Sequence, residues 1–211
     1  MFETVLSPNA KTALDILGQG ELLNNAYLAG GTSLALRLGH RISIDFDFFS
    51  PLKFDPIILA NSLKTTGKFD IDTAAGTTLI GQFNNVKFSY FRYEYPLLNP
   101  TDDYQGIKIA SIDDIIAMKL VAISDRNTKK DFIDLYTICH QKNISIEEMF
   151  ELYNKKYHVL EENKYTLIKS MTYFEDADAD AMPEMLADIS WDEVKKFLIS
   201  ESLRLGKTYL S

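Results

Sequence analysis

The amino-acid sequence predicts an α+β fold, with a helix-flanked β-sheet in the first half of the chain and a bundle of helices in the second. The first observation is the stretch 42–48, where apolar residues alternate strictly with polar or acidic ones, as in a half-buried strand. The second is the pattern after residue 111, where apolar residues recur at helical spacing. We therefore expect a sheet domain over residues 1–105 and a helical part over residues 106–211.

Local signals place the elements of the first half. The pair Ser7–Pro8 suits the N-cap and first position of a helix, and Asp55–Pro56 repeats that signal. A short apolar run, 26–29, indicates a buried strand that ends at two glycines, and a short helix follows at 32–38. Three further strands, rich in β-branched and aromatic residues, are expected at 69–73, 77–83 and 86–95.

The second half carries helix signals only. Ser111 and Asp114 resemble a capping box in front of the apolar run IIAMKLVAI, which predicts a helix. Four more helices are expected at residues 129–141, 145–156, 161–173 and 191–206. No internal repeat or low-complexity tract interrupts the sequence.

Composition excludes several classes of protein. The 211 residues are 46% hydrophobic and 25% charged, which is ordinary for a globular protein. No run of 18 apolar residues indicates a membrane span, so we expect no membrane partner. Cys139 is the only cysteine, which excludes an internal disulfide and a cysteine-based metal site. We therefore expect a cytoplasmic protein.

The net charge of −8 comes from one segment. Residues 175–193 hold eight acidic residues and no Lys or Arg, which leaves 22 acidic against 22 basic residues elsewhere. The segment is either a solvated linker or helix face, or a docking surface for a basic partner. Because no basic field dominates the rest, the chain is not expected to be a generic nucleic-acid binder.

The sequence from Gly30 to Asp47 carries the chemistry. Gly30 and Gly31 end the buried strand, so the backbone there can approach a ligand closely, and the following helix N-terminus favours phosphate. The hydroxyls of Thr32 and Ser33 are expected to bind the same phosphate oxygens.

Downstream, Asp45 and Asp47 lie two residues apart on the expected strand, so both carboxylates share one face. Two close carboxylates repel, and a hard divalent cation bound through them and substrate phosphates removes that conflict. Either half alone is common in proteins, as a turn or as a solvated strand face. The two halves in strand–turn–helix–strand order predict a phosphate and metal site.

The stretch GGTSLALRLGHRISIDFDFF resembles the AbiEii/AbiGii toxin family of nucleotidyltransferases, relatives of the DNA polymerase beta superfamily. The family's later motifs are a Lys-containing helix and a basic-Asp-x-x-Asp-Leu segment, which Lys119 and Asp131 match. The resemblance covers roughly residues 25–140. It implies a nucleotidyltransferase-like mixed sheet followed by a helical C-terminal part that completes the active-site cleft.

The resemblance also implies an activity, which is Mg²⁺- or Mn²⁺-dependent transfer of a nucleoside monophosphate from a nucleoside triphosphate to an acceptor. RNA is one implied acceptor, and a cognate antitoxin protein is an implied partner, because several family members are toxins. Asp45, Asp47, Lys119 and Asp131 are the implied catalytic residues, and the first two are the implied metal ligands. The implied nucleotide-binding residues are Gly30, Gly31, Thr32, Ser33 and Arg41.

Other interpretations stay open at this point. Lys119 lies among apolar residues and could simply be the solvated position of an amphipathic helix. Superfamily members often place a third carboxylate on a neighbouring strand, where this sequence offers Ser89. A nucleotide-binding module without turnover is therefore the first alternative, and an Asp-x-Asp sugar-nucleotide transferase is another. For an active enzyme, we expect Lys119 to approach the Asp pair. We also expect alanine substitution of Lys119 or Asp131 to lower transfer by orders of magnitude, with little change in melting temperature.

Overall fold

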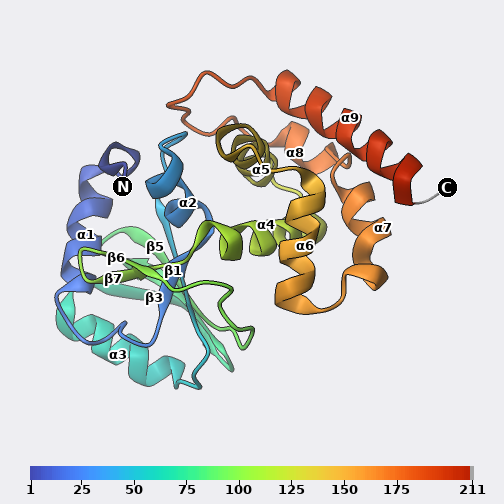
Figure 1. The fold of residues 1–211 in the computed structure, drawn as a ribbon. Helices are drawn as coiled ribbons and strands as arrows, with labels where there is room; N and C mark the ends of the chain where they lie inside the picture. Colours follow the sequence, from blue (N-terminus) through green and yellow to red (C-terminus); the bar gives the residue numbers. More distant parts are fainter. Residues whose placement is uncertain (210–211) are drawn as a thin grey trace. The chain divides into compact units, whose positions relative to one another are not determined.

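The computed structural model describes residues 1–209, and the chain divides into two compact units, Met1–Ser111 and Ile112–Ser211. The first unit is built on a seven-stranded sheet with the strand order β3-β4-β5-β2-β1-β7-β6 (Figure 1). The pairs β2–β5 and β1–β7 are parallel and the others antiparallel, so the expected mixed sheet is confirmed. Its strands are β1 (Tyr27–Ala29), β2 (Asp45–Ser50), β3 (Phe69–Ala75), β4 (Thr78–Phe83), β5 (Val86–Arg92), β6 (Asp102–Tyr104) and β7 (Ile107–Ile109).

Capping residues begin the helices of this unit as predicted. Ser7 accepts a hydrogen bond from the amide of Ala10, and Asp55 accepts from two amides of the next helix. One face of the sheet packs against helices of this unit around a core that contains Phe46, Phe48 and Phe88. The helices are η1 (Glu3–Val5), α1 (Pro8–Gly18), α2 (Gly30–Leu38) and α3 (Pro56–Thr66).

The first unit differs from the expectation in two places. The alternating stretch 42–48 is not one strand, because β2 begins at Asp45 and the preceding loop reverses the pattern. Ser43 is buried there, whereas Ile44 is 60% exposed. The hairpin β6–β7 was not predicted, because its strands have only three residues each and follow a Pro-containing loop.

The described part of the second unit, residues 112–209, is helical. A buried ion pair joins α4 to α6, with Lys156 Nζ 2.7 Å from Asp114 Oδ1 and both side chains fully buried. The four expected helices after the first are confirmed within a few residues, and the five-residue α8 was not expected. The helices are α4 (Ile112–Arg126), α5 (Lys129–Lys142), α6 (Ile146–Tyr157), α7 (Leu160–Ser170), α8 (Glu175–Ala179) and α9 (Trp191–Tyr209).

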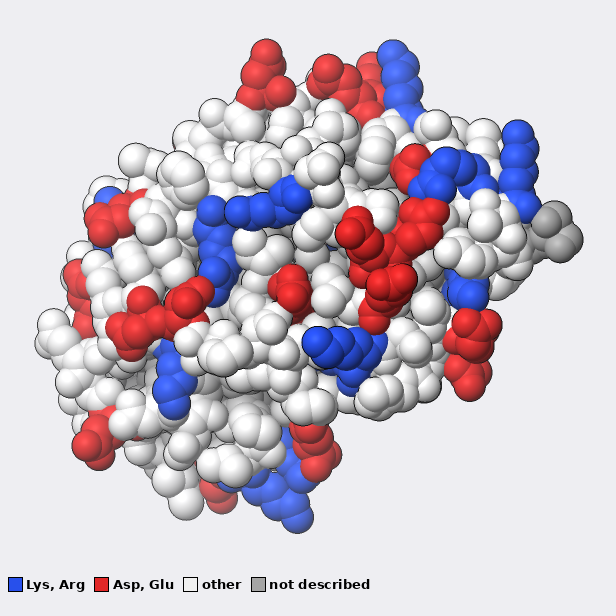
Figure 2. Space-filling model, in the orientation of Figure 1, with Lys and Arg blue, Asp and Glu red and all other residues white. Residues whose placement is uncertain are grey.

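Part of the acidic segment 175–193 is bound to its own unit. Asp178 accepts hydrogen bonds from Trp191 Nε1 at 2.6 Å and Lys195 Nζ at 3.0 Å, and Asp180 accepts from the amide of Lys129 at 3.0 Å. On the face drawn in Figure 2, blue and red side chains of the described residues are interspersed. No helix within residues 1–209 is long and apolar enough to cross a membrane.

Candidate active site

Asp45 and Asp47 lie on one face of β2, as predicted, with Phe46 and Phe48 buried on the other. Both aspartates are partly exposed, so that face of the strand is accessible to a ligand. Strand β2 lies between β1 and β5 in the sheet. The register therefore gives the Asp pair one neighbouring strand on each side.

The glycine turn lies directly beside Asp47. Ala29, the last residue of β1, pairs with Asp47, and Gly30 begins α2 with a left-handed φ of 65°. A Cβ atom at Gly30 would lie only 2.7 Å from Asp47 Oδ2, so a side chain there would collide with the carboxylate. Glycine is required both for the backbone conformation and for this close approach. The first motif thus places a helix N-terminus next to the second.

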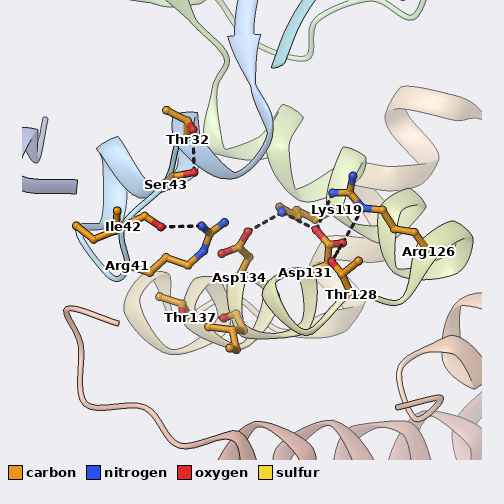
Figure 3. A network of polar contacts seen from close by, with 11 residues as sticks. Thr32, Arg41, Ile42, Ser43, Lys119, Arg126, Thr128, Asp131, Asp134 and Thr137 are labelled. Atoms are coloured by element: carbon orange, nitrogen blue, oxygen red, sulfur yellow. Dashed lines mark hydrogen bonds and ion pairs between the residues drawn. The ribbon is translucent and has the colours of Figure 1, made fainter. Parts of the chain in front are cut away.

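Arg41 covers the next glycine of the turn. A Cβ atom at Gly31 would lie 2.3 Å from Arg41 Nη2, which leaves no room for a side chain unless the guanidinium moves. Arg41 Nη1 donates to the carbonyl of Ile42 at 3.1 Å, and the residue is 3% exposed (Figure 3). The predicted nucleotide-binding residues Gly30, Gly31 and Arg41 are therefore brought together with Asp47.

The hydroxyls of the turn are directed inward. Thr32 Oγ1 lies 2.8 Å from Ser43 Oγ and donates to the carbonyl of Asp45, so it fixes the loop that leads into β2 (Figure 3). Ser33 Oγ is buried, with no hydrogen-bond partner among residues 1–209. Thr32 and Ser33 are 1% and 0% exposed, so their hydroxyls are not accessible in this structure. Phosphate binding at these residues stays a prediction.

In the second unit, Lys119 lies between two buried carboxylates. Its Nζ atom is 2.7 Å from Asp131 Oδ1 and 2.5 Å from Asp134 Oδ2, and these three side chains are at most 3% exposed (Figure 3). The alternative of a solvated Lys119 is therefore wrong. Asp134, the second aspartate of the Asp-x-x-Asp-Leu segment, contacts the lysine as well as Asp131 does.

Asp131 accepts hydrogen bonds on both carboxylate oxygens. Oδ1 accepts from Lys119 and from Arg126 Nη2 at 3.0 Å, and Oδ2 accepts from Arg126 Nε at 2.8 Å and Thr128 Oγ1 at 2.6 Å. Thr128 was not predicted, although its spacing of three from an acidic residue is a recognisable helix-start signal. These contacts fix the orientation of the carboxylate.

Burial opposes the charge on Asp131, but the Lys119 ammonium and the Arg126 guanidinium outweigh it and hold the pKa of Asp131 well below its usual range. A carboxylate with a lowered pKa is a weak base. The geometry therefore favours a positioning role for Asp131, which orients Lys119 and Arg126, over proton abstraction. Its assignment to catalysis, like the expected approach of Lys119 to the Asp pair, stays a prediction.

The position facing Asp47 on β5 is Ser89, which is 4% exposed. No group of three or more His, Cys, Asp or Glu side chains within residues 1–209 is arranged to hold a metal ion. A cation at this face would therefore depend on the two carboxylates of β2 and on oxygens supplied by a substrate.

In the comparison with known proteins, this chain matches the model of one protein family. The model of the family described as "Nucleotidyl transferase AbiEii toxin, Type IV TA system" matches residues 12–101 and 90–204. The protein aq_aa25 of Aquifex aeolicus (strain VF5) is 38% identical over 198 residues, which cover 91% of this chain and 93% of that protein.

Solved structures show the same fold at low sequence identity. JHP933 from Helicobacter pylori is 18% identical with a TM-score of 0.59, and the alignment covers 96% of this chain and 94% of that one. MenT4, a nucleotidyltransferase toxin from Mycobacterium tuberculosis H37Rv, is 16% identical with a TM-score of 0.50, covering 93% and 86%.

Proposed function

Because the chain belongs to the AbiEii nucleotidyl transferase toxin family and is a nucleotidyltransferase, we propose that it transfers a nucleoside monophosphate from a nucleoside triphosphate to an RNA acceptor. Pyrophosphate is the second product. We further propose that the protein acts in the cytoplasm as the toxin of a toxin–antitoxin or abortive-infection system, with an antitoxin protein as its partner.

The observation that carries the proposal is the contact of the glycine turn with the Asp pair. The Cβ position of Gly30 lies 2.7 Å from Asp47 Oδ2, so amides at the start of α2 and a carboxylate of β2 border the same space. Phosphoryl transfer depends mainly on positioning and charge neutralisation. At this turn, amides, the Arg41 guanidinium and carboxylates can position a triphosphate and help to neutralise its charge.

The donor set fits a hard divalent cation. Asp45 and Asp47 present two partly exposed carboxylates on one face, and Mg²⁺ commonly binds through one or two carboxylates plus substrate phosphates. Mg²⁺, or Mn²⁺ in its place, would neutralise charge on the triphosphate when bound there. The amides of residues 30–33 and the Arg41 guanidinium would orient the phosphates.

The proposal also keeps Lys119 and Asp131 as residues needed for transfer, on the family's pattern. Asp131, with Arg126 and Thr128 on its oxygens, would hold Lys119 in one orientation. The acceptor hydroxyl then attacks the α-phosphorus, the bond to the β-phosphate oxygen breaks, and the hydroxyl proton leaves to solvent.

Ser89 favours a second candidate function, a nucleotide-binding module without turnover. It faces Asp47 where superfamily members often carry a third carboxylate, and Glu94, beyond the end of β5, is engaged by Arg92 at 2.5 Å. Such a module would bind a triphosphate with metal and transfer nothing. The sugar-nucleotide transferase considered from the sequence is not proposed, because the family match covers both motifs.

A labelling experiment separates these functions. The protein is incubated with each α-labelled nucleoside triphosphate, Mg²⁺ and total bacterial RNA, and covalent label is counted. We expect label in RNA with the parent and with Asp70→Asn, whose carboxylate is exposed on β3, and none with Asp45→Asn. Metal-dependent triphosphate binding without any label would support the non-catalytic module instead, and label transferred equally by Asp45→Asn would refute the assigned site.

A further inference from the structure

Lys87 is an exposed cation beside the Asp pair. It is the second residue of β5, and it pairs directly with Asp45 in the parallel register of β2 and β5. Directly opposed residues project from the same face of a sheet, with Cβ atoms about 5 Å apart. Lys87 therefore shares the open face with Asp45 and Asp47, and it forms no ion pair with any of residues 1–209.

The Asp pair has two different sides. On the β1 side, Ala29 pairs with Asp47 and the glycine turn follows at once, so the triphosphate belongs there. On the β5 side, the partners are Lys87 and Ser89. In phosphoryl transfer the attacking and leaving oxygens lie roughly in line on opposite sides of the phosphorus. The acceptor hydroxyl must then approach from the side opposite the pyrophosphate, which is the β5 side.

The polar row continues across the sheet. Gln82 of β4 pairs with Lys87 and is exposed, so a cation and an amide follow Asp45 at intervals of about 4.8 Å, the spacing of neighbouring strands. The hairpin between β4 and β5 turns at Asn84 and Asn85, which have φ values of 48° and 62°. This tight turn fixes the register of Lys87 against its neighbours.

We propose that Lys87 binds a backbone phosphate of the acceptor and that Gln82 extends this contact, so that the acceptor is an RNA chain lying across β5 and β4. The inference rests on the proposed nucleotidyl transfer and names the side from which its acceptor enters. An ammonium beside a neutral amide suits a phosphate-bearing chain, because it supplies charge to the phosphate and hydrogen bonds to the sugar.

The test compares Lys87→Gln with Lys64→Gln, an exposed lysine on α3, the helix that packs on the opposite face of the sheet. Three quantities are measured: triphosphate affinity by calorimetry, label transfer against concentration of total RNA, and affinity for a fluorescein-labelled 20-nucleotide single-stranded RNA. We expect Lys87→Gln to weaken RNA binding and raise the half-saturating RNA concentration about tenfold, with triphosphate affinity unchanged. Its RNA affinity should also depend less on salt, by about one phosphate contact.

Other outcomes overturn the inference. Equal RNA affinity for Lys87→Gln and Lys64→Gln would show that Lys87 does not bind the acceptor, whether or not transfer occurs. Loss of triphosphate affinity in Lys87→Gln would place the lysine on the donor side. If the parent binds no triphosphate and transfers no label, the proposed function fails, and the RNA affinities still decide the role of Lys87.

Discussion

Replacing Lys119 by methionine should strongly destabilise the protein. The ammonium lies between the fully buried carboxylates of Asp131 and Asp134, at 2.7 and 2.5 Å, and methionine keeps its volume without its charge. Removing one partner of a buried ion pair costs about 3–5 kcal/mol of unfolding free energy. For a unit of this size, we expect the melting temperature to fall by roughly 10 °C or more. The sequence-based expectation of little change in melting temperature is therefore replaced.

The pH dependence gives this prediction a second readout. In the parent, the lowered pKa of Asp131 means that its charge stabilises the fold above the unfolded pKa of about 3.9, and that this contribution is lost only as the pH falls through the folded value. In Lys119→Met, the charge that mainly offsets the burial of Asp131 is gone, so the pKa of Asp131 should rise. Protonation then removes the uncompensated buried charge. The difference in unfolding free energy between the variant and the parent should therefore narrow as the pH falls from 8 to 5.

Urea unfolding at several pH values measures both effects. The control is Lys68→Met, which breaks an exposed pair with Asp70 whose side chains are 67% and 60% exposed, and which should cost at most about 1 kcal/mol. A Lys119→Met protein as stable as the parent at pH 8 would refute the account of the buried cluster. A difference in unfolding free energy between variant and parent that widens as the pH falls would refute the assigned charge states.

Three further predictions concern single residues. Asp47→Asn should abolish Mg²⁺-dependent triphosphate binding in calorimetry while the melting temperature changes by less than about 2 °C, because surface changes rarely alter stability; normal binding would refute the metal assignment. Gly31→Val should weaken triphosphate binding far more than monophosphate binding, because the new Cβ would lie 2.3 Å from Arg41 Nη2 and would push the guanidinium away. Equal losses for the two ligands would show that the turn is purely structural. Burial, with Glu201 nearby, raises the pKa of Cys139 to about 12, so at pH 8 the folded protein should react with a thiol reagent about 10³-fold more slowly than the urea-unfolded chain, and equal rates would contradict the buried thiol.

The first motifs were predictable because their partners are close in sequence. Capping by Ser7 and Asp55 depends on residues within one helical turn, and the face shared by Asp45 and Asp47 follows from strand geometry alone. The contact between Gly30 and Asp47 needed one more fact, the pairing of β1 with β2. Sequence reasoning could place both motifs together because few residues separate them.

Longer-range features were not predictable in the same way. Lys119 contacts residues 12 and 15 positions later, and only the packing of α4 against α5 makes these neighbours. Ile44 fits a strand pattern, yet it is exposed because it lies in the loop before β2, which the hydrogen bonds of Thr32 to Ser43 and to the carbonyl of Asp45 hold in place. Lys87 is unremarkable in sequence and becomes a candidate only through the register of β5 with β2.

The central claim is that this chain transfers a nucleoside monophosphate, and the position of the label in the nucleotide tests it most directly. Parallel reactions with α-labelled and γ-labelled triphosphate, Mg²⁺ and total RNA should give labelled RNA only from the α-labelled nucleotide, with the γ-label recovered in pyrophosphate. Asp47→Asn should give neither product. Label entering RNA from the γ-position, or no label and no pyrophosphate from any of the four triphosphates, would contradict nucleotidyl transfer by this protein.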